Sequence, residues 1–217
     1  MLNAIDLECY RGDRLLFRNL NLTLKAGEIL QVQGPNGSGK TSLLRILCGL
    51  TLPTAGEVHW RGENIHRNRE RFLSRIVYVG HQNGIKLELS PLENLKIACS
   101  LTGQVKITPG NALLRFELHR FRDVPAYTLS AGQRRRVALA RLLLGHPCCE
   151  HFDSERACQE HISCWILDEP FTALDRAGVM VMESVLEEHA NSGGITILTT
   201  HQPLDINVDS IQKIELG

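Results

Sequence analysis

One short run of residues has the composition and order needed to hold phosphate groups: Gly34, Pro35, Asn36, Gly37, Ser38, Gly39, Lys40 and Thr41. Its glycines let the backbone curl so that successive N–H groups point at phosphate oxygens, and a helix starting near Lys40 adds its positive dipole end. We expect Lys40 to neutralise the β- and γ-phosphates of a nucleoside triphosphate. Thr41 offers Mg²⁺ a hydroxyl ligand, and Ser42 completes the candidate phosphate-binding set. The alternative, a glycine-rich turn without a ligand, is disfavoured by the Gly-Lys-Thr ending and its flanks.

Two acidic residues end an apolar segment. Asp168 and Glu169 directly follow the apolar residues 165–167. Ligands of open α/β folds bind at the carboxyl ends of the strands, so both carboxylates would lie at the binding edge. We expect Asp168 to hold Mg²⁺ and Glu169 to handle the attacking water. The alternative is that these acids only cap the next segment. It is disfavoured because an apolar strand rarely ends in an acidic pair that has no function.

A histidine follows a second apolar segment. His201 comes directly after residues 195–200 and would reach the same edge of the sheet. A histidine in this place is more often structural when it stands alone, but here it joins the other candidate residues. We therefore include His201 among the candidate catalytic groups, with Lys40 and Glu169.

The elements that must position these residues follow from the spacing of apolar side chains. Short alternating runs in residues 2–33 predict strands, and apolar residues from 43 to 50 recur at helical spacing. Pro91 marks an expected helix start, and Pro109-Gly110 an expected break. Further strands are expected at 58–60, 75–80, 165–167 and 194–200, and helices within 84–128, at 131–144 and at 179–189. Strands alternating with helices indicate a mostly parallel sheet.

Composition and charge limit the classes of partner. The chain has 217 residues, 43% apolar and 22% charged, which is typical of a globular protein with one large domain. The chain has 24 basic residues (Lys and Arg) and 24 acidic residues (Asp and Glu). Its net charge of zero therefore gives no general attraction to nucleic acid. The densest basic cluster, Arg134 to Arg136, is interpreted as a solvated face flanking a helix.

No segment of the sequence predicts export or membrane insertion. The amino terminus lacks a basic region followed by an apolar core, and no run of about 18 apolar residues occurs. We expect any membrane contact to come through partners. The odd number of cysteines, 7, favours reduced thiols in the cytosol over a disulfide framework.

A five-residue motif extends the pattern to a known family. Residues 129–133, Leu-Ser-Ala-Gly-Gln, resemble the signature of the ATP-binding cassette (ABC) family, with Ala131 where glycine is usual. The match is specific because it stands between the phosphate loop and the acidic pair, and the resemblance covers essentially the whole chain. Gln82 fits the family's glutamine loop, residues 173–175 its D-loop and His201 its switch histidine. Tyr10 fits an aromatic that stacks on adenine, although a packed strand aromatic would look the same.

The family resemblance implies the fold and its divisions. It implies an α/β phosphate-loop NTPase with a mostly parallel core sheet, an antiparallel β subdomain and a small helical subdomain. Residues 1–217 would form one ATP-binding domain. Its core and β subdomain would comprise 1–83 and 129–217, its helical subdomain 84–128, and an insertion 145–163.

The resemblance also implies roles at a shared site. Two cassettes would pair head to tail, as a homodimer, so that Ser130, Gly132 and Gln133 of one face the ATP bound by the other. Glu169 would polarise the attacking water while His201 and Lys40 stabilise the transferred phosphoryl group. Thr41, Gln82 and Asp168 would hold Mg²⁺, and Gln82 would also link the site to the partner.

Three classes of protein compete for these motifs. The signature argues against an unrelated phosphate-loop kinase or GTPase. The distance from Thr41 to Leu129 leaves no room for the long coiled coil of DNA-repair relatives, and translation relatives carry two cassettes where this chain has one. A transporter motor remains, and it needs separate integral membrane subunits.

Three sequence segments narrow the resemblance to one branch of the family. Residues 80–86, 165–175 and 199–204 look like the ATPase subunits of haem-export complexes in bacterial cytochrome c maturation. This implies work at the cytoplasmic face of the inner membrane, in haem delivery or release of haem from its chaperone. The alternatives are another bacterial ABC transporter and a soluble ABC ATPase outside transport.

The segment 145–163 departs from the family pattern. It is rich in cysteine and histidine: His146, Cys148, Cys149, His151, Cys158 and His161, with Cys164 just beyond. These spacings match no standard zinc site, so we expect a surface insertion, with Cys164 packed at the strand, in preference to a metal or haem site. Cys9, Cys48 and Cys99 are expected to be small core or surface residues.

Overall fold

The core of the molecule is a parallel sheet. The computed structural model describes residues 1–102, 107–144, 163–208 and 210–217. The core sheet has the order β6-β7-β8-β3-β9, and its paired strands all run parallel. Its strands are β6 (Ile76–Val79), β7 (Cys164–Asp168), β8 (Ile195–Thr199), β3 (Ile29–Gln33) and β9 (Ile211–Glu215). The predicted fold class, an α/β fold with a mostly parallel core sheet, is confirmed.

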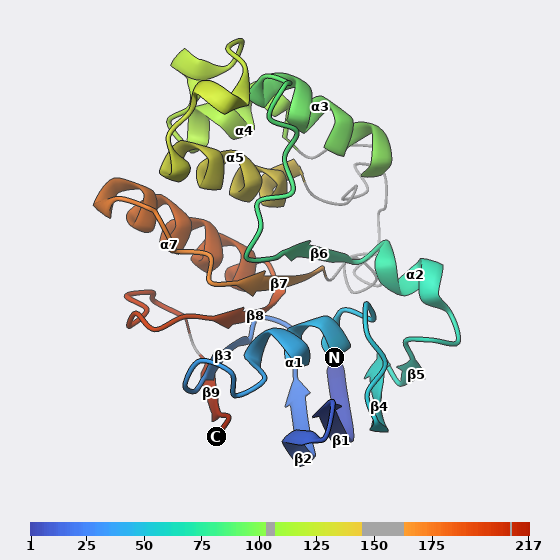
Figure 1. Cartoon of the computed structure of the whole chain (residues 1–217). Helices are drawn as coiled ribbons and strands as arrows, with labels where there is room; N and C mark the ends of the chain where they lie inside the picture. Colours follow the sequence, from blue (N-terminus) through green and yellow to red (C-terminus); the bar gives the residue numbers. More distant parts are fainter. Residues whose placement is uncertain (103–106, 145–162, 209) are drawn as a thin grey trace.

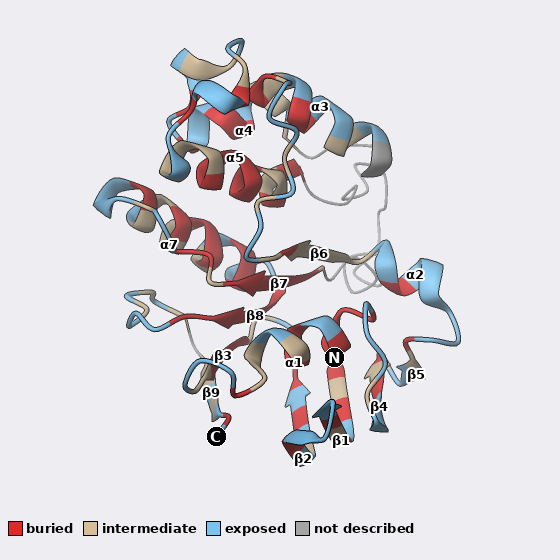
Figure 2. Cartoon of the chain, in the orientation of Figure 1, coloured by how far each residue is buried: buried red, intermediate tan, exposed pale blue. Residues whose placement is uncertain are grey.

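Helices cover both faces of this sheet (Figure 1). α1 (Lys40–Leu47) packs on one face in a cluster with Leu30, Val32 and Ile197. α7 (Arg176–Asn191) and α5 (Ala131–Leu144) belong to a second cluster with the neighbouring strand residues Ile29 and Leu198. Successive strand residues point to opposite faces, and both faces of β7, β8 and β3 are largely buried, so these inner strands consist mainly of apolar residues. Figure 2 shows β7 and β8 in the colour of buried residues and the edge strand β6 in that of intermediate ones.

A smaller antiparallel sheet packs against α1 on the side away from the core sheet. Its order is β2-β1-β4-β5, and it shares the first hydrophobic cluster with α1. Its strands are β1 (Leu2–Arg11), β2 (Arg14–Leu24), β4 (Ala55–Trp60) and β5 (Glu63–Asn64). The tight β1–β2 turn contains Gly12, whose φ of 61° lies in the left-handed region that glycine adopts without strain. This hairpin ends close to the phosphate loop.

The helical region forms a separate layer above α5. It comprises α3 (Pro91–Thr102), α4 (Pro109–Arg115) and the short 3₁₀ turns η1 (His119–Phe121) and η2 (Ala126–Thr128). Pro91 begins α3 as predicted, and Ser90 and Glu93 cap it through reciprocal hydrogen bonds. Pro109 does interrupt the helical run, and it also begins α4, which Thr108 caps.

Some elements lie outside the sequence-based expectations. α2 (Arg69–Leu73), β5 and β9 were not predicted. β9 is a short edge strand of partly exposed residues, so it lacks the apolar run by which the inner strands were recognised. The cysteine- and histidine-rich segment 145–162 lies outside the described residues. Cys164 is fully buried at the start of β7, as expected.

None of the helices in the described part of the chain has the length and apolar character needed to cross a membrane.

Candidate active site

The phosphate loop joins β3 to α1 through backbone conformations that need glycine. Gly34, Gly37 and Gly39 have φ angles of 140°, 82° and 105°. A Cβ on Gly34 would lie 2.2 Å from the carbonyl oxygen of Leu216, so the chain end after β9 also fixes this glycine. The Ser38 hydroxyl is buried at the loop, without a hydrogen-bond partner among the described residues. The loop therefore carries a donor that a bound phosphate would satisfy.

Lys40 is the first residue of α1 and folds back over the loop. Its Nζ donates hydrogen bonds to the carbonyl oxygens of Gly34 at 2.6 Å and Pro35 at 3.1 Å. The ammonium group therefore lies inside the curl of backbone that the sequence assigned to phosphate. Helix α1 begins at the same place, so its dipole and the lysine charge add up there.

Asp168 connects the end of β7 to the phosphate loop helix. Its Oδ2 accepts a hydrogen bond of 2.8 Å from the Thr41 hydroxyl, and its Oδ1 one of 2.8 Å from the Thr199 hydroxyl. The Asp168 carboxylate is buried. The burial of Tyr78 on the neighbouring strand β6 raises the pKa of its hydroxyl, and the charge of Asp168 raises it further. The three adjacent oxygens of Thr41 and Asp168 are the hard ligands that Mg²⁺ prefers, so the residues present fit this ion.

Glu169 turns sharply away from β7. Its φ of 49° is left-handed, which is uncommon for a residue with a side chain. Its N–H donates to the Thr199 hydroxyl at 2.8 Å, which holds the turn. Its Oε1 lies 3.5 Å from Nε2 of the exposed His201. The carboxylate and the imidazole predicted from separate strands are thus brought together.

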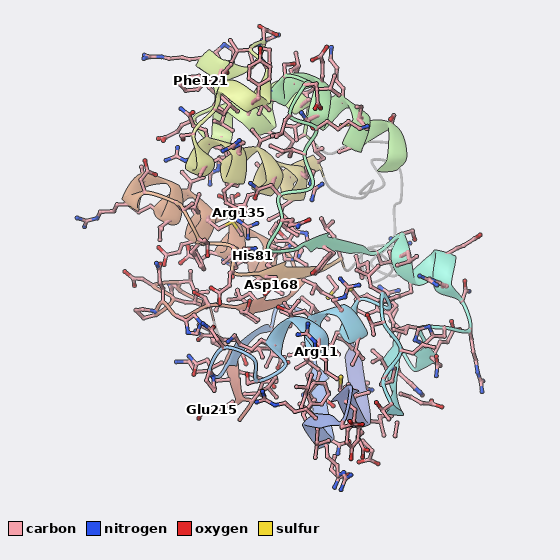
Figure 3. All side chains as sticks on the ribbon, viewed as in Figure 1. Arg11, His81, Phe121, Arg135, Asp168 and Glu215 are labelled. Atoms are coloured by element: carbon pink, nitrogen blue, oxygen red, sulfur yellow. The ribbon has the colours of Figure 1, made fainter. Side chains whose placement is uncertain are left out.

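Lys40, Thr41, Asp168 and Glu169 line a common cleft of about 290 Å³, whereas His201 is not among its lining residues. Figure 3 shows Asp168 and His81 together at the end of β7, with Arg11 beside α1. The cleft is lined by Arg11, Leu16, Asn36, Gly37, Gly39, Lys40, Thr41, Ser42, His81, Asp168 and Glu169. Sequence reasoning missed Arg11 and Leu16, which belong to no motif, and His81, which lies in the family-like segment 80–86 but was given no role.

Comparison with known proteins shows the family to which this chain belongs. Residues 17–154 match the family model described as ABC transporter. This chain belongs to the ABC transporter family. Curated relatives are named cytochrome c biogenesis ATP-binding export protein CcmA. The one from Methylococcus capsulatus is 49% identical over 95% of this chain and 93% of its own. The one from Aliivibrio fischeri is 43% identical over all of both chains.

Solved ABC structures share the fold. A putative ABC transporter ATP-binding protein from Pyrococcus furiosus superposes with a TM-score of 0.78 at 26% identity, over 99% of this chain and 96% of its own. The ATP-binding cassette MJ0796, solved as a dimer bound to ADP and phosphate, gives a TM-score of 0.73 at 25% identity. That alignment covers 93% of this chain and 88% of the MJ0796 chain.

The ABC signature lies apart from the cleft of its own chain. Ser130 and Gln133 cap α5 reciprocally: the Ser130 N–H donates to Gln133 Oε1 at 2.9 Å, and the Gln133 N–H to Ser130 Oγ at 3.2 Å. A Cβ on Gly132 would lie 2.5 Å from the Ala173 carbonyl oxygen, so the D-loop packs directly on this glycine. The described cleft contains none of the three.

Gln82 and Tyr10, like His201, also lie outside the lining. Gln82 is exposed and follows His81, which does line the cleft. The Tyr10 hydroxyl accepts a hydrogen bond of 2.7 Å from Arg18, while the neighbouring Arg11 lines the cleft. The adenine-stacking role of Tyr10 and the metal role of Gln82 stay predictions.

The arginine run of the signature helix is not a solvated face, and this interpretation was wrong. Arg135 and Arg136 are 3% and 8% exposed. Arg136 pairs with Glu117 at 2.8 Å and with Asp175, the residue that caps α7. The backbone N–H of Gly178 and the Arg136 guanidinium lower the pKa of the Asp175 carboxyl. The run of three arginines predicted that their side chains would be exposed. Arg135 and Arg136 are buried instead, because distant segments supply hydrogen-bond acceptors for their guanidinium groups.

Proposed function

We propose that this chain is the ATP-hydrolysing subunit of a membrane ABC transporter, acting as a pair of cassettes. The observation that carries the proposal is the Thr41–Asp168 hydrogen bond, 2.8 Å long, between the phosphate loop helix and the end of β7. It brings a lysine, a hydroxyl and two carboxylates to one cleft, which is the set that triphosphate hydrolysis uses.

The residues of the cleft divide the chemistry of ATP hydrolysis. The loop N–H groups and Lys40 would bind the β- and γ-phosphates. Thr41 and Asp168 would hold Mg²⁺, with Gln82 as a further ligand; when bound, the ion neutralises charge that develops on the phosphate oxygens. The Thr199 hydroxyl fixes the other oxygen of Asp168, which orients the carboxylate toward Thr41.

The hydrolytic step would depend on Glu169 and His201. Glu169 would orient a water molecule for attack on the γ-phosphorus and accept its proton. His201, 3.5 Å from the Glu169 carboxylate, would stabilise charge on the transferred phosphoryl group together with Lys40. Glu169, whose backbone turn is left-handed, lines the same cleft as Lys40 and Thr41.

The signature residues would act on the second cassette of the pair. Ser130, Gly132 and Gln133 lie outside their own chain's cleft, which fits contact with the ATP bound by the partner copy. The MJ0796 cassette, solved as a dimer, supports this arrangement for a protein of the same fold. Binding of two ATP molecules would hold the pair closed, and loss of the γ-phosphates would open it.

The transport step would belong to cytochrome c maturation. Curated relatives at 42–49% identity are named as cytochrome c biogenesis export proteins. We propose that this chain binds integral membrane subunits at the cytoplasmic face of the inner membrane and drives haem delivery or its release from a chaperone. It would reach the membrane only through those subunits.

Complementation tests this proposal. A bacterial strain lacking its own ATPase subunit for cytochrome c biogenesis would receive the wild-type chain or Lys40→Ala, and covalent haem in c-type cytochromes would be measured. We expect the wild-type chain to restore the signal and Lys40→Ala to leave it at background, with equal amounts of both proteins at the membrane. Failure of the wild-type chain where the Methylococcus relative succeeds would point to another bacterial ABC transporter.

A further inference from the structure

Arg135 connects two segments of the cleft that are far apart in sequence. Arg135 is the fifth residue of α5, and its buried guanidinium makes five hydrogen bonds. Nη1 donates to the Gly80 carbonyl at 2.8 Å and to Asn83 Oδ1 at 3.3 Å. Nη2 donates to the Asp168 and Glu169 carbonyls, both at 2.8 Å, and Nε to the Pro170 carbonyl at 3.3 Å. All five acceptors are neutral oxygens.

The burial of this charge indicates a specific use. Desolvation lowers the pKa of the Arg135 guanidinium, so the folded protein pays for keeping a cation there. A leucine or methionine would fill the same space without that cost. The arginine instead supplies donors in a rigid planar fork, which fixes the acceptors relative to one another. Figure 3 shows Arg135 between α5 and the strand ends that carry His81 and Asp168.

One side of the fork holds the turn that aims Glu169. The backbone of Glu169 is left-handed and needs support from its surroundings. The Thr199 hydroxyl supports the turn at the Glu169 N–H, and Arg135 supports it at the carbonyls of residues 168–170. A small change in the path of these carbonyls would swing the Glu169 carboxylate away from the attacking water.

The other side of the fork holds the segment that leaves β6 for the helical region. Gly80 and Asn83 flank His81, which lines the cleft, and Gln82. Arg141, two turns further along α5, donates to the Gly84 carbonyl at 3.3 Å and extends the same attachment. A shift of the segment from Gly80 to Gly84 would therefore be passed to the Glu169 turn through one side chain.

We propose that Arg135 is a positioning residue for catalysis: it sets the direction of Glu169 and makes that direction depend on the segment from Gly80 to Asn83. This inference rests on the proposed ATPase function. It predicts an effect on the hydrolytic step through Glu169, and little effect on ATP binding, because none of its bonds involves the phosphate loop.

The test uses the complex purified from membranes through a tag on this chain. Variants Arg135→Gln and Arg135→Lys are compared with Arg134→Gln, which makes the same charge change at the neighbouring half-buried position. We expect Arg135→Gln to lower kcat roughly tenfold to a hundredfold, with KM and the Kd for ATP within about twofold of wild type. Arg135→Lys should recover part of kcat, and Arg134→Gln should stay near wild type.

A double variant separates positioning from a general structural role. If Arg135 acts through Glu169, adding Arg135→Gln to Glu169→Gln should change the residual turnover by less than about twofold. Equal fold losses in both backgrounds would overturn the proposal, and so would a wild-type kcat or a selective loss of ATP affinity in Arg135→Gln. If that variant does not fold, Arg135→Lys decides: reduced kcat at unchanged ATP affinity supports the proposal, and any other result overturns it. A wild-type complex that neither binds nor hydrolyses ATP would instead refute the proposed function.

Discussion

The Thr41 hydroxyl donates a 2.8 Å hydrogen bond to Asp168 Oδ2, across 127 positions of sequence. The bond joins the first turn of α1 to the last residue of β7, and the Thr199 hydroxyl holds the second carboxylate oxygen at the same distance. Neither oxygen of Asp168 therefore rotates freely. The proposed magnesium ligands are fixed by the fold itself, so changing either of them should alter the ion requirement.

Replacing the Thr41 hydroxyl tests this directly. We expect Thr41→Val to raise the Mg²⁺ concentration for half-maximal ATP turnover by roughly tenfold to a hundredfold, because both the ligand and its bond to Asp168 are lost. Thr41→Ser keeps the hydroxyl and should stay close to wild type. ATP hydrolysis measured against Mg²⁺ at fixed ATP gives both values. An unchanged requirement in Thr41→Val would remove Thr41 from the proposed metal site.

The end of β1 offers a comparison between two adjacent residues. Arg11 lines the cleft, whereas the Tyr10 hydroxyl is engaged by Arg18. We expect Arg11→Ala to weaken ATP binding by about tenfold, the loss of one cationic contact, and Tyr10→Ala to weaken it less. Equilibrium binding of ATP measures both. The reverse order would establish Tyr10 as the stacking aromatic that the family resemblance implies.

Gly132 of the signature should tolerate no side chain. A Cβ there would meet the Ala173 carbonyl oxygen at 2.5 Å, so Gly132→Ala should destabilise the protein by about 1–3 kcal/mol and lower ATP turnover. Gly110 has open space around its Cβ position and is the matched control. Gly110→Ala should be neutral or stabilising by about 0.5–1 kcal/mol. Urea unfolding measures the stability of both variants. Equal stabilities would show that the D-loop moves away from a side chain at position 132 at little cost.

The sequence predicted the parts of this site that consist of contiguous residues. The phosphate loop, the acids after β7 and His201 after β8 each follow an apolar strand, so their place at one sheet edge could be inferred from the order of elements. The structure adds the contacts between them. Thr199, which bonds both Asp168 and the Glu169 N–H, was regarded only as a strand residue.

The errors have a common physical cause. Arg135 and Arg136 look exposed in sequence because the surroundings that satisfy them come from segments 19 to 55 positions away. The strand β9 is short and partly exposed, yet its neighbour Leu216 closes on Gly34. Long-range acceptors and edge pairing leave no local pattern, so periodicity could not reveal them.

Buried thiols should make the protein sensitive to alkaline pH. Burial raises the pKa of Cys48 from 9.0 to about 11 and that of Cys164 from 9.0 to about 12. The folded chain keeps these protons above pH 9.0 while the unfolded chain releases them, so this contribution to stability is complete below pH 9.0 and is lost as the pH rises toward the folded pKa values.

The size of this effect can be measured on one variant. Above the unfolded pKa, the free energy of unfolding should fall by up to about 1.4 kcal/mol per pH unit for each thiol. Cys164→Ala should therefore reduce this pH dependence by the contribution of one thiol. Urea unfolding at about pH 8 and about pH 10 gives the slope, and the lower pH gives the pH-independent packing cost. Identical slopes in the variant and the wild type would show that Cys164 does not contribute.

We propose that one cleft binds ATP and hydrolyses it through Glu169. The most direct measurement gives Glu169→Gln and the wild-type chain ATP and Mg²⁺, then follows phosphate release and the size and nucleotide content of the protein. We predict that the variant keeps ATP affinity, loses turnover by about a hundredfold or more, and accumulates as a dimer holding unhydrolysed ATP. Wild-type turnover by Glu169→Gln, or failure of the variant to retain ATP, would rule out hydrolysis through Glu169 in this cleft.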